Sequence, residues 1–254
     1  MKSFDLSIVV CTFKRLKFLK KKIKEFKEIS DEINVELVLV IENNDKKKLK
    51  YLKQLKIKNS NYLINQNNNV NYAADLGIKN AKGKYVCIHG DDDFFDKKNL
   101  KYLKKNLKFN HSWIIGYGKY INDDNVIVRK KHAYIKNYLI DTKLKFLLKS
   151  INYLMCPSVF LKRKIILDFG GYPKDCKYGS DHKLWIDFIE RNALIIKKNL
   201  SYSTYSKKTI SGKFNFQKYF YLYELEKKKL NTFEKFLRLI FLMLKIIIDI
   251  LKKL

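Results

Sequence analysis

Arginine is scarce in this sequence, although the chain is strongly basic. Lys and Arg number 54 against 25 Asp and Glu, which gives a formal net charge of +29, yet only five of the basic residues are Arg. Because Arg is the preferred residue for bidentate recognition of phosphates and bases, the charge is weak evidence for nucleic acid, and no specific nucleic-acid partner is expected. The charge favours an anionic membrane surface instead.

Paired cysteines and an obvious leader are also missing. The four Cys residues are widely spaced, with no CxxC pair, so reduced thiols and a cytoplasmic location are expected. Met1 to Asp5 lead straight into an apolar run, so no signal peptide is expected. With 46% apolar and 14% aromatic residues, the chain can bury a sizeable core, which excludes wholesale disorder. Its length allows one large α/β domain or two small ones.

Apolar runs alternate with helical periodicity over the first ninety residues. The runs typical of strands are Leu6 to Thr12, Val35 to Ile41, Tyr62 to Ile64 and Lys84 to Ile88. Strand, helix, strand implies parallel pairing. The pattern therefore predicts an α/β fold with a Rossmann-like, mostly parallel central sheet flanked by helices, and ligands bind outside the carboxyl ends of such strands.

The second half of the chain is less regular. Strands are predicted around Trp113 to Ile115, Val126 to Val128 and Ser158 to Leu161, and a helix is predicted over His182 to Arg191. In the first half, the predicted helix Asn71 to Asn80 contains two Ala and one Gly, which lets it lie close to its neighbour. No internal repeat or low-complexity linker is evident.

Three consecutive carboxylates, Asp91 to Asp93, follow the strand Lys84 to Ile88 with no basic residue among them. A bound divalent cation is the readiest way to relieve the repulsion between such charges. The alternative is an acidic turn that only favours the helix starting near Asp96. Polar residues at 12–15 and 42–45 also follow strands, and this convergence predicts one site.

From Leu6 to about Ser211 the chain resembles the family 2 glycosyltransferases, whose nucleotide-sugar-binding domain has the GT-A fold. The matching stretches are Ser7 to Arg15, Glu36 to Asn44, Asn71 to Gly83, Lys84 to Asp93, and Gly170 to Trp185 with its Gly-Gly-Tyr and Leu-Trp patterns. The resemblance implies an inverting transfer of sugar from a nucleotide diphosphate donor to a hydroxyl of a surface glycan or lipid-linked saccharide. It places the GT-A catalytic domain at residues 1–211 and a helical tail at 212–254.

The resemblance also implies a metal site. Asp92 falls at the position of the metal-binding aspartate, Asp93 occupies the neighbouring acidic slot, and Asp91 lies near the ribose or the metal. The cofactor would be Mg²⁺ or Mn²⁺, held by oxygen ligands and neutralising the charge on the departing diphosphate. No His-rich motif competes for a softer metal.

Further residues match the family's nucleotide-binding positions. Thr12 and Arg15 match the loop that lines the nucleotide, and Glu42 matches the acid that accepts a hydrogen bond from the base. The family often has Asp-Asp-Gly-Ser at this turn where the chain has Ile-Glu-Asn-Asn, so the choice between Glu42 and Asn43 stays open. Asp75 stands where many members carry an Arg-Asn pair before the metal motif.

Asp181 matches the family's catalytic base, although the Glu that usually precedes this base is replaced by Ser180. A carboxylate within hydrogen-bond reach can take the proton of an attacking hydroxyl. The alternative is that Asp181 is only the N-cap of the helix that follows, where Asp is a favoured residue.

The last stretch of the chain is an amphipathic helix with a narrow polar stripe. The polar residues of this stripe are Glu234, Lys235, Arg238, Lys245, Asp249 and Lys252. The charge-free run in it is far shorter than the roughly 20 residues that span a bilayer. The pattern therefore predicts interfacial insertion, peripheral on the inner face of the cytoplasmic membrane. The alternative is a helix packed on the catalytic domain or on a second subunit.

Two other functions fit parts of the sequence. A nucleotidyltransferase would need a Gly-rich loop after the first strand, and the stretch Thr12 to Arg15 contains no Gly. A non-catalytic basic protein that binds nucleic acid or membrane on a decayed transferase fold is the second alternative. Against it stands the acidic cluster, which would repel polyanions.

Overall fold

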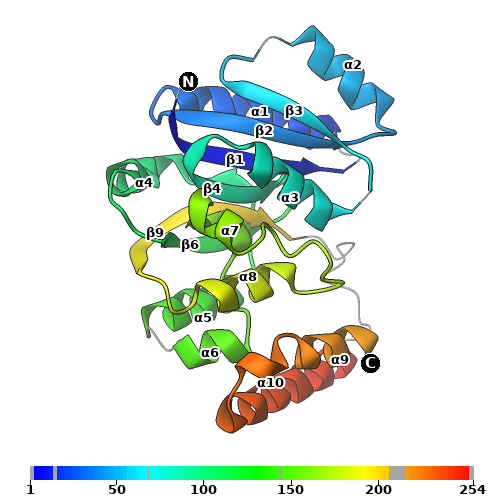
Figure 1. The fold of residues 1–254 in the computed structure, drawn as a ribbon, viewed down its shortest axis with the longest axis vertical. Coiled ribbons are helices and arrows are strands. Elements are labelled where there is room, and N and C mark those ends of the chain that lie inside the picture. The colour runs from blue at the N-terminus through cyan, green and yellow to red at the C-terminus, as the bar shows by residue number, and fades with distance from the viewer. Residues whose placement is uncertain are drawn as a thin grey trace.

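The computed structural model describes residues 3–13, 16–55, 57–67, 69–142, 145–205 and 216–251. One sheet runs through the molecule, with the strand order β3-β2-β1-β4-β8-β6-β9-β5 and with β7 paired to β6 (Figure 1). Helices cover both faces of this sheet, so the predicted α/β architecture is confirmed.

The first half of the chain forms the parallel part of the sheet. Its strands are β1 (Phe4–Thr12), β2 (Val35–Glu42), β3 (Ser60–Asn65) and β4 (Gly83–Gly90), connected by α1 (Leu16–Ser30), α2 (Lys46–Gln54) and α3 (Val70–Asn80). A Cβ added to Gly77 of α3 would collide with Val9 of β1, so the small residues do bring this helix close to the sheet. All four strands lie where the apolar runs predict them.

The second half of the chain contributes both parallel and antiparallel strands to the sheet. Its strands are β5 (Phe94–Phe95), β6 (Trp113–Ile121), β7 (Ile127–Val128), β8 (Val159–Lys162) and β9 (Ala193–Thr204). The strand β8 pairs antiparallel with both β4 and β6, whereas β9 runs parallel to β6 with irregular register near Tyr117. The helices are α4 (Leu100–Leu107), α5 (Lys130–Asp141), α6 (Lys145–Ser150), α7 (Arg163–Asp168) and α8 (Ser180–Phe188), with short 3₁₀ turns at Lys97–Asn99, Cys156–Ser158 and Lys227–Lys229. The predicted helix at His182 thus begins two residues earlier and ends at Phe188.

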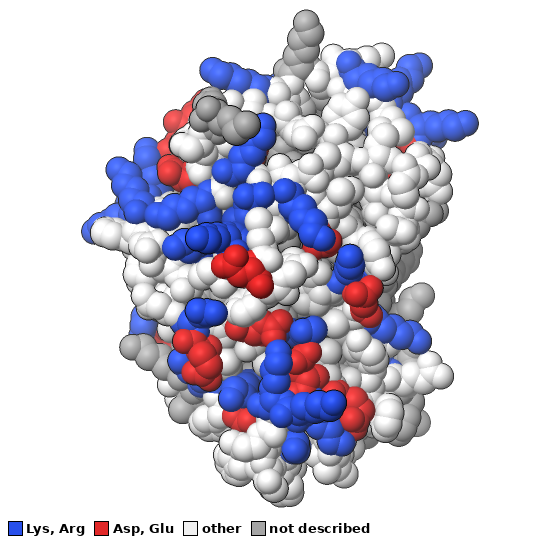
Figure 2. Space-filling model, in the orientation of Figure 1, with Lys and Arg blue, Asp and Glu red and all other residues white. Residues whose placement is uncertain are grey.

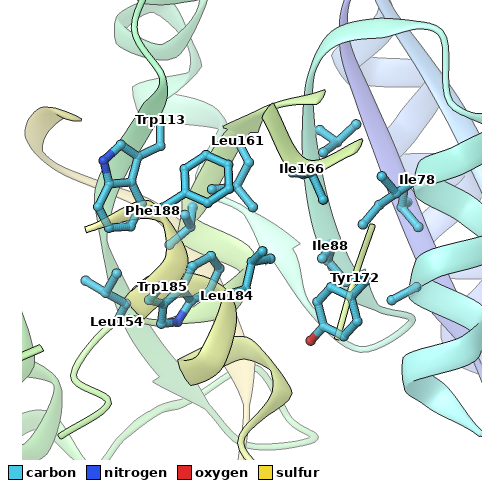
Figure 3. Close-up of a cluster of buried hydrophobic side chains, with 14 of the residues drawn as sticks. Ile78, Ile88, Trp113, Leu154, Leu161, Ile166, Tyr172, Leu184, Trp185 and Phe188 are labelled. Atoms are coloured by element: carbon cyan, nitrogen blue, oxygen red, sulfur yellow. The ribbon is translucent and has the colours of Figure 1, made fainter. Parts of the chain in front are cut away.

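Two apolar cores lie on opposite faces of the sheet. One is covered by α1, α2 and α4, and the other by α3, α7 and α8. Figure 3 shows the second core, in which Trp113 of β6 lies 6.3 Å from the ring of Trp185 and 5.8 Å from that of Phe188. These rings fix α8 on the sheet, and α8 begins with the residues around Asp181.

The tail consists of α9 (Phe216–Glu224) and α10 (Thr232–Leu251), at the end of the molecule farthest from α2 (Figure 1). The helix α10 contacts α6 and α9. Among the described residues, no helix is long and apolar enough to cross a membrane. The proposed domain boundary at residue 211 falls in a stretch outside the described residues and stays a prediction.

Candidate active site

Carboxyl ends of three parallel strands meet at one edge of the sheet. The register sets Gly90 at the end of β4 opposite Cys11 of β1, and it sets Thr12 opposite the residue before Glu42. Asp91 to Asp93 follow directly. The convergence expected from the sequence is therefore present at this edge.

The predicted nucleotide-binding residues at this edge differ in exposure. Thr12 and Glu42 are buried, whereas Asn43 is exposed. Arg15 lies outside the described residues. The assignment of these residues to the nucleotide stays a prediction.

Asp75 has contacts of a different kind. Its carboxylate accepts a hydrogen bond from Tyr172 N at 3.0 Å and forms a 2.7 Å ion pair with Lys79. A Cβ on Gly171, whose φ is +101°, would collide with the same carboxylate. Asp75 therefore ties α3 to the Gly-Gly turn that precedes α8, and its role toward the donor stays a prediction.

The loop Asp91 to Asp93, which we term the aspartate loop, is held at Asp92 and Asp93 by donors from the main chain and from β9. Gly90 N donates to Asp93 Oδ2 at 2.7 Å, and Ser203 Oγ donates to Asp93 Oδ1 at 2.9 Å. Thr204 Oγ1 donates to the main-chain oxygen of Asp92. A Cβ on Gly90 would lie 2.7 Å from Asp92 Oδ1, so the loop closes tightly over this glycine.

A buried network supports the aspartate loop from the side of α1. Lys22 Nζ lies 2.7 Å from Glu25 Oε2 and 3.2 Å from His89 Nδ1, and it also donates to the main-chain oxygen of Asp93. Burial and the charge of Lys22 hold the pKa of His89 well below its usual value. His89 is therefore neutral and stacks on Phe95, with ring centroids 4.5 Å apart.

Burial and a neighbouring charge change the pKa of one carboxylate in the aspartate loop. Burial and the charge of Asp92 raise the pKa of Asp93 to about 6. Within the described residues, no three His, Cys, Asp or Glu side chains are grouped to hold a metal by themselves. Mg²⁺ in nucleotide sites, however, takes only one or two carboxylates and completes its shell with water and phosphate oxygens. One or two carboxylates of the aspartate loop would be enough for such a site, and the choice of Asp92 and Asp93 as the ligands stays a prediction.

Asp181 is the second residue of α8, and Gly179, with φ +68°, occupies the N-cap position. Asp181 is therefore not the N-cap. Asn152 Nδ2 donates to Asp181 Oδ2 at 2.9 Å, and His182 N donates to Asp181 Oδ1 at 2.8 Å. Each carboxylate oxygen keeps further acceptor capacity.

The charges of Asp181 and of the aspartate loop act on the same two side chains. Burial raises the pKa of Tyr120 to about 12, with the charge of Arg129 opposing the shift and the charges of Asp181 and Asp93 contributing to it. The pKa of Cys156 is raised well above its usual value by burial, and then by the same two carboxylates. Asn152, which donates to Asp181, lies four residues before Cys156, whose Sγ is 3.7 Å from the main-chain oxygen of Ile88 on β4. The segment Asn152 to Cys156 therefore connects Asp181 to the strand that ends at the aspartate loop.

Several residues of this region were not identified from the sequence. Asn152 contacts Asp181, Ser203 and Thr204 hold the aspartate loop, and the charges of Asp181 and Asp93 both raise the pKa of Tyr120. Lys136 is near Asp181 as well, and burial lowers its pKa to about 8. All are common polar residues outside any motif, and a correct placement of β9 is the signal that would have found Ser203 and Thr204.

Comparisons with known proteins identify the family of the chain. The sequence profile of the family described as Glycosyl transferase family 2 matches residues 7–169, which is more than half of the chain. No curated protein matches the sequence.

Solved structures resemble the fold at low sequence identity. S. aureus TarS 1-349 in complex with UDP-GlcNAc is 15% identical over 91% of this chain and 69% of its own, with a TM-score of 0.66. The mannosyltransferase PcManGT from Pyrobaculum calidifontis, in complex with GDP-Man and Mn²⁺, is 13% identical over 82% of this chain and 59% of its own, with a TM-score of 0.58. The chain spans 41% of the longer TarS structure. The likeness shows a GT-A fold, and the family profile shows that the chain belongs to glycosyltransferase family 2.

Proposed function

We propose that the protein transfers a sugar from a nucleotide diphosphate donor to a hydroxyl of a surface glycan or lipid-linked saccharide, with inversion at the anomeric carbon. Family membership supplies the reaction class. The observation that carries the proposal is that the segment Asn152 to Cys156 connects two carboxylate centres, because Asn152 donates to Asp181 and Cys156 contacts Ile88 on the strand that ends at the aspartate loop. A transferase needs one such centre for the leaving diphosphate and one for the attacking hydroxyl.

The donor site lies at the carboxyl ends of β1, β2 and β4. Thr12, Arg15 and either Glu42 or Asn43 contact the nucleotide in this proposal, and Asp91 and Asp92 lie toward its ribose and diphosphate. Mg²⁺ or Mn²⁺, when bound by Asp92, supplies a Lewis acid that neutralises charge on the leaving oxygens. The structure of PcManGT with GDP-Man and Mn²⁺ supports such a donor and metal.

Asp181 is the proposed base. The acceptor oxygen attacks the anomeric carbon, the bond to the diphosphate breaks with its electron pair on the nucleotide, and the hydroxyl proton passes to Asp181. Hydrogen bonds from Asn152 and His182 N orient the carboxylate for this transfer. A single displacement inverts the anomeric centre.

Donor hydrolysis tests this proposal, because water then takes the place of the unidentified acceptor. Purified protein is screened with UDP-, GDP-, CMP- and TDP-sugars and Mn²⁺ or Mg²⁺. We expect Asp92→Ala to abolish metal-dependent nucleotide release and Asp181→Asn to lower it about a hundredfold with donor affinity intact. The exposed carboxylates Asp124 and Asp168 supply the matched controls Asp124→Ala and Asp168→Asn. Nucleotide release by Asp181→Asn at the wild-type rate would exclude Asp181 as the base.

The tail supports a location on the inner face of the cytoplasmic membrane. The polar residues Glu234 and Arg238 of α10 are buried against the protein, and the apolar face is turned outward. The exposed apolar side chains among the described ones of α10 are Phe233, Phe236, Leu239, Met243, Leu244 and Ile247. In Figure 2 the lowest tip of the molecule, on the side where Figure 1 places α10, is white, and a group of charged side chains lies directly above it. We term this set of six residues the apolar face of α10.

The positive charge of the protein favours one kind of partner for the apolar face of α10. The exposed residues Lys228 and Lys245 flank it, and the chain carries a formal net charge of +29. Two copies of the chain would bring like charges together, whereas an anionic phospholipid surface is complementary to them. We therefore propose interfacial docking of this face on an anionic bilayer, and association of two copies is the outcome that would contradict it.

A further inference from the structure

The inward side of α10 holds a buried arginine whose hydrogen bonds, among the described residues, go to main-chain oxygens. The side chain of Arg238 is 1% exposed. Its Nη1 donates to the oxygens of Leu225 and Tyr223, and its Nη2 donates to the oxygen of Lys149 at the end of α6. Burial lowers its pKa to about 10. Burying a charged side chain costs free energy unless it is hydrogen-bonded, so the three hydrogen bonds of Arg238 compensate for its burial and hold the main chain that accepts them.

Glu234, one turn earlier, joins α10 to the same end of α6. Its carboxylate accepts a hydrogen bond from Asn231 N at 2.9 Å, and Asn231 Oδ1 accepts one from Glu234 N at 2.8 Å, which makes a capping box at the start of α10. Glu234 Oε1 also lies 3.3 Å from Lys149 Nζ. Ser150 Oγ donates to the main-chain oxygen of Glu234 at 3.0 Å. Two consecutive residues of α6 are therefore held by α10.

The other side of α6 contacts the beginning of α8. His182 Nε2 lies 2.6 Å from the main-chain oxygen of Leu148, and because this oxygen can only accept, Nε2 carries the proton. Two residues after Ser150, Asn152 donates to Asp181. The segment from Leu148 to Asn152 thus lies between α10 and Asp181, as the placement of α6 and α8 in Figure 1 also shows.

We propose that Arg238 is a positioning residue for glycosyl transfer. By holding the carbonyl of Lys149, together with the Ser150–Glu234 contact, it fixes the segment that presents Asn152 to Asp181, and so orients the carboxylate toward the acceptor. Arg238 touches neither donor nor acceptor. This inference rests on the proposed role of Asp181 as the base.

The test compares Arg238→Met, which keeps the length of the side chain but loses its donors, with the wild type in the donor-hydrolysis assay. We expect kcat to fall about tenfold, because small misplacements of catalytic groups have effects of this order or larger. The KM for the donor and the donor affinity by calorimetry stay unchanged. Arg191→Met is the matched control, since Arg191 is exposed and contacts only the ring of Phe169 among described cation–ring pairs.

A double-mutant cycle separates positioning from general stability. Asn152→Ala removes the donor to Asp181, and if Arg238 acts through this contact, the double variant loses no more kcat than the worse single variant. The two melting-temperature shifts, by contrast, are expected to add. Additive losses in kcat, or an unchanged kcat in Arg238→Met, would overturn the inference.

The outcomes remain distinguishable if a variant fails to fold or if the base is wrong. Should Arg238→Met not fold, the cycle is run with Arg238→Lys, which keeps the charge and one donor and is expected to lose part of the kcat. Should Asp181→Asn hydrolyse donor at the wild-type rate, the proposed base fails and this inference with it. Should Asp181→Asn be inactive while both Arg238 variants keep full kcat, only the inference fails.

Discussion

Removing two rings from the apolar face of α10 should detach the protein from anionic vesicles. Phe233 and Phe236 are 58% and 59% exposed. An aromatic side chain presents about 200 Å², so each ring offers roughly 120 Å² to a partner. If half of that area enters the interface, at about 25 cal/mol per Å² each ring contributes about 1.5 kcal/mol. Phe233→Ser with Phe236→Ser should therefore weaken binding about a hundredfold.

The assay is sedimentation with vesicles of phosphatidylglycerol and phosphatidylcholine mixed in varying ratio, at two salt concentrations. Binding should rise with the anionic fraction and fall with salt, because lysines contribute the charge attraction. Phe109→Ser is the matched control: Phe109 is 52% exposed and follows α4, away from the tail. Deletion of residues 232–254 is less informative, since it also removes Arg238.

Two results would refute this reasoning. Equal binding by the double Phe variant and by Phe109→Ser would show that charge alone holds the protein on the vesicles. A wild-type protein that ignores vesicles but forms dimers, which the double Phe variant dissociates, would assign the apolar face of α10 to a second copy of the chain. Sedimentation velocity without lipid makes that distinction.

Three further predictions concern the site and the core. Burial lowers the pKa of His182 to about 4. Between about pH 6.5 and 4 the unfolded chain therefore binds a proton that the folded chain excludes, and the free energy of unfolding falls as the pH drops. His182→Gln should reduce the slope of unfolding free energy against pH, measured by urea denaturation, by up to about 1.4 kcal/mol per pH unit. Gly90→Ala places a Cβ 2.7 Å from Asp92 Oδ1 and should raise the Mn²⁺ concentration needed for donor hydrolysis with little change in melting temperature. Gly77→Ala should destabilise the fold by about 1–3 kcal/mol in denaturant titrations, because the collision with Val9 outweighs the gain in helix propensity; a more stable Gly77→Ala would contradict the close approach of α3.

The parallel half of the sheet could be predicted because its strands contain short apolar runs separated by stretches with helical periodicity. All eight residues of β2 are buried, and only Glu36 interrupts the apolar run Val35 to Ile41. The strand β9 has no such signal. It carries the exposed pair Lys197 and Lys198, and its register against β6 shifts near Tyr117. A strand with a bulge loses the alternation that identifies strands.

The helix α5 escaped prediction for a similar reason. Of its twelve residues only Ala133 and Ile140 are buried, while Tyr134, Ile135 and Tyr138 are exposed. Its apolar residues therefore do not follow the periodicity of a helix with one buried face. Tertiary contacts stabilise α5, and a single sequence does not show which residues make these contacts.

The sequence predicts the candidate site only where the functional residues are adjacent in the chain. Three adjacent carboxylates at the end of β4 stand out in any sequence. The side chains that orient them do not, because Ser203 is 110 residues from Asp93 and Asn152 is 29 residues from Asp181. Serine and asparagine occur throughout the surface of proteins, so only the fold tells these two from the rest.

The orientation of α10 is the clearest case in which the pattern was visible and its meaning was not. An amphipathic helix has two faces, and its periodicity does not say which one meets the protein. The usual outcome would bury the apolar face. Here two members of the polar stripe, Glu234 and Arg238, are buried instead, whereas Lys245 is exposed. Arg238 donates to three main-chain oxygens, which belong to α6, α9 and the turn after α9. Burying Glu234 and Arg238 while six apolar side chains stay in water runs against the hydrophobic effect. The arrangement becomes favourable once the outward face is covered, so the contacts that position α6 and the membrane proposed for the apolar face are two parts of one explanation.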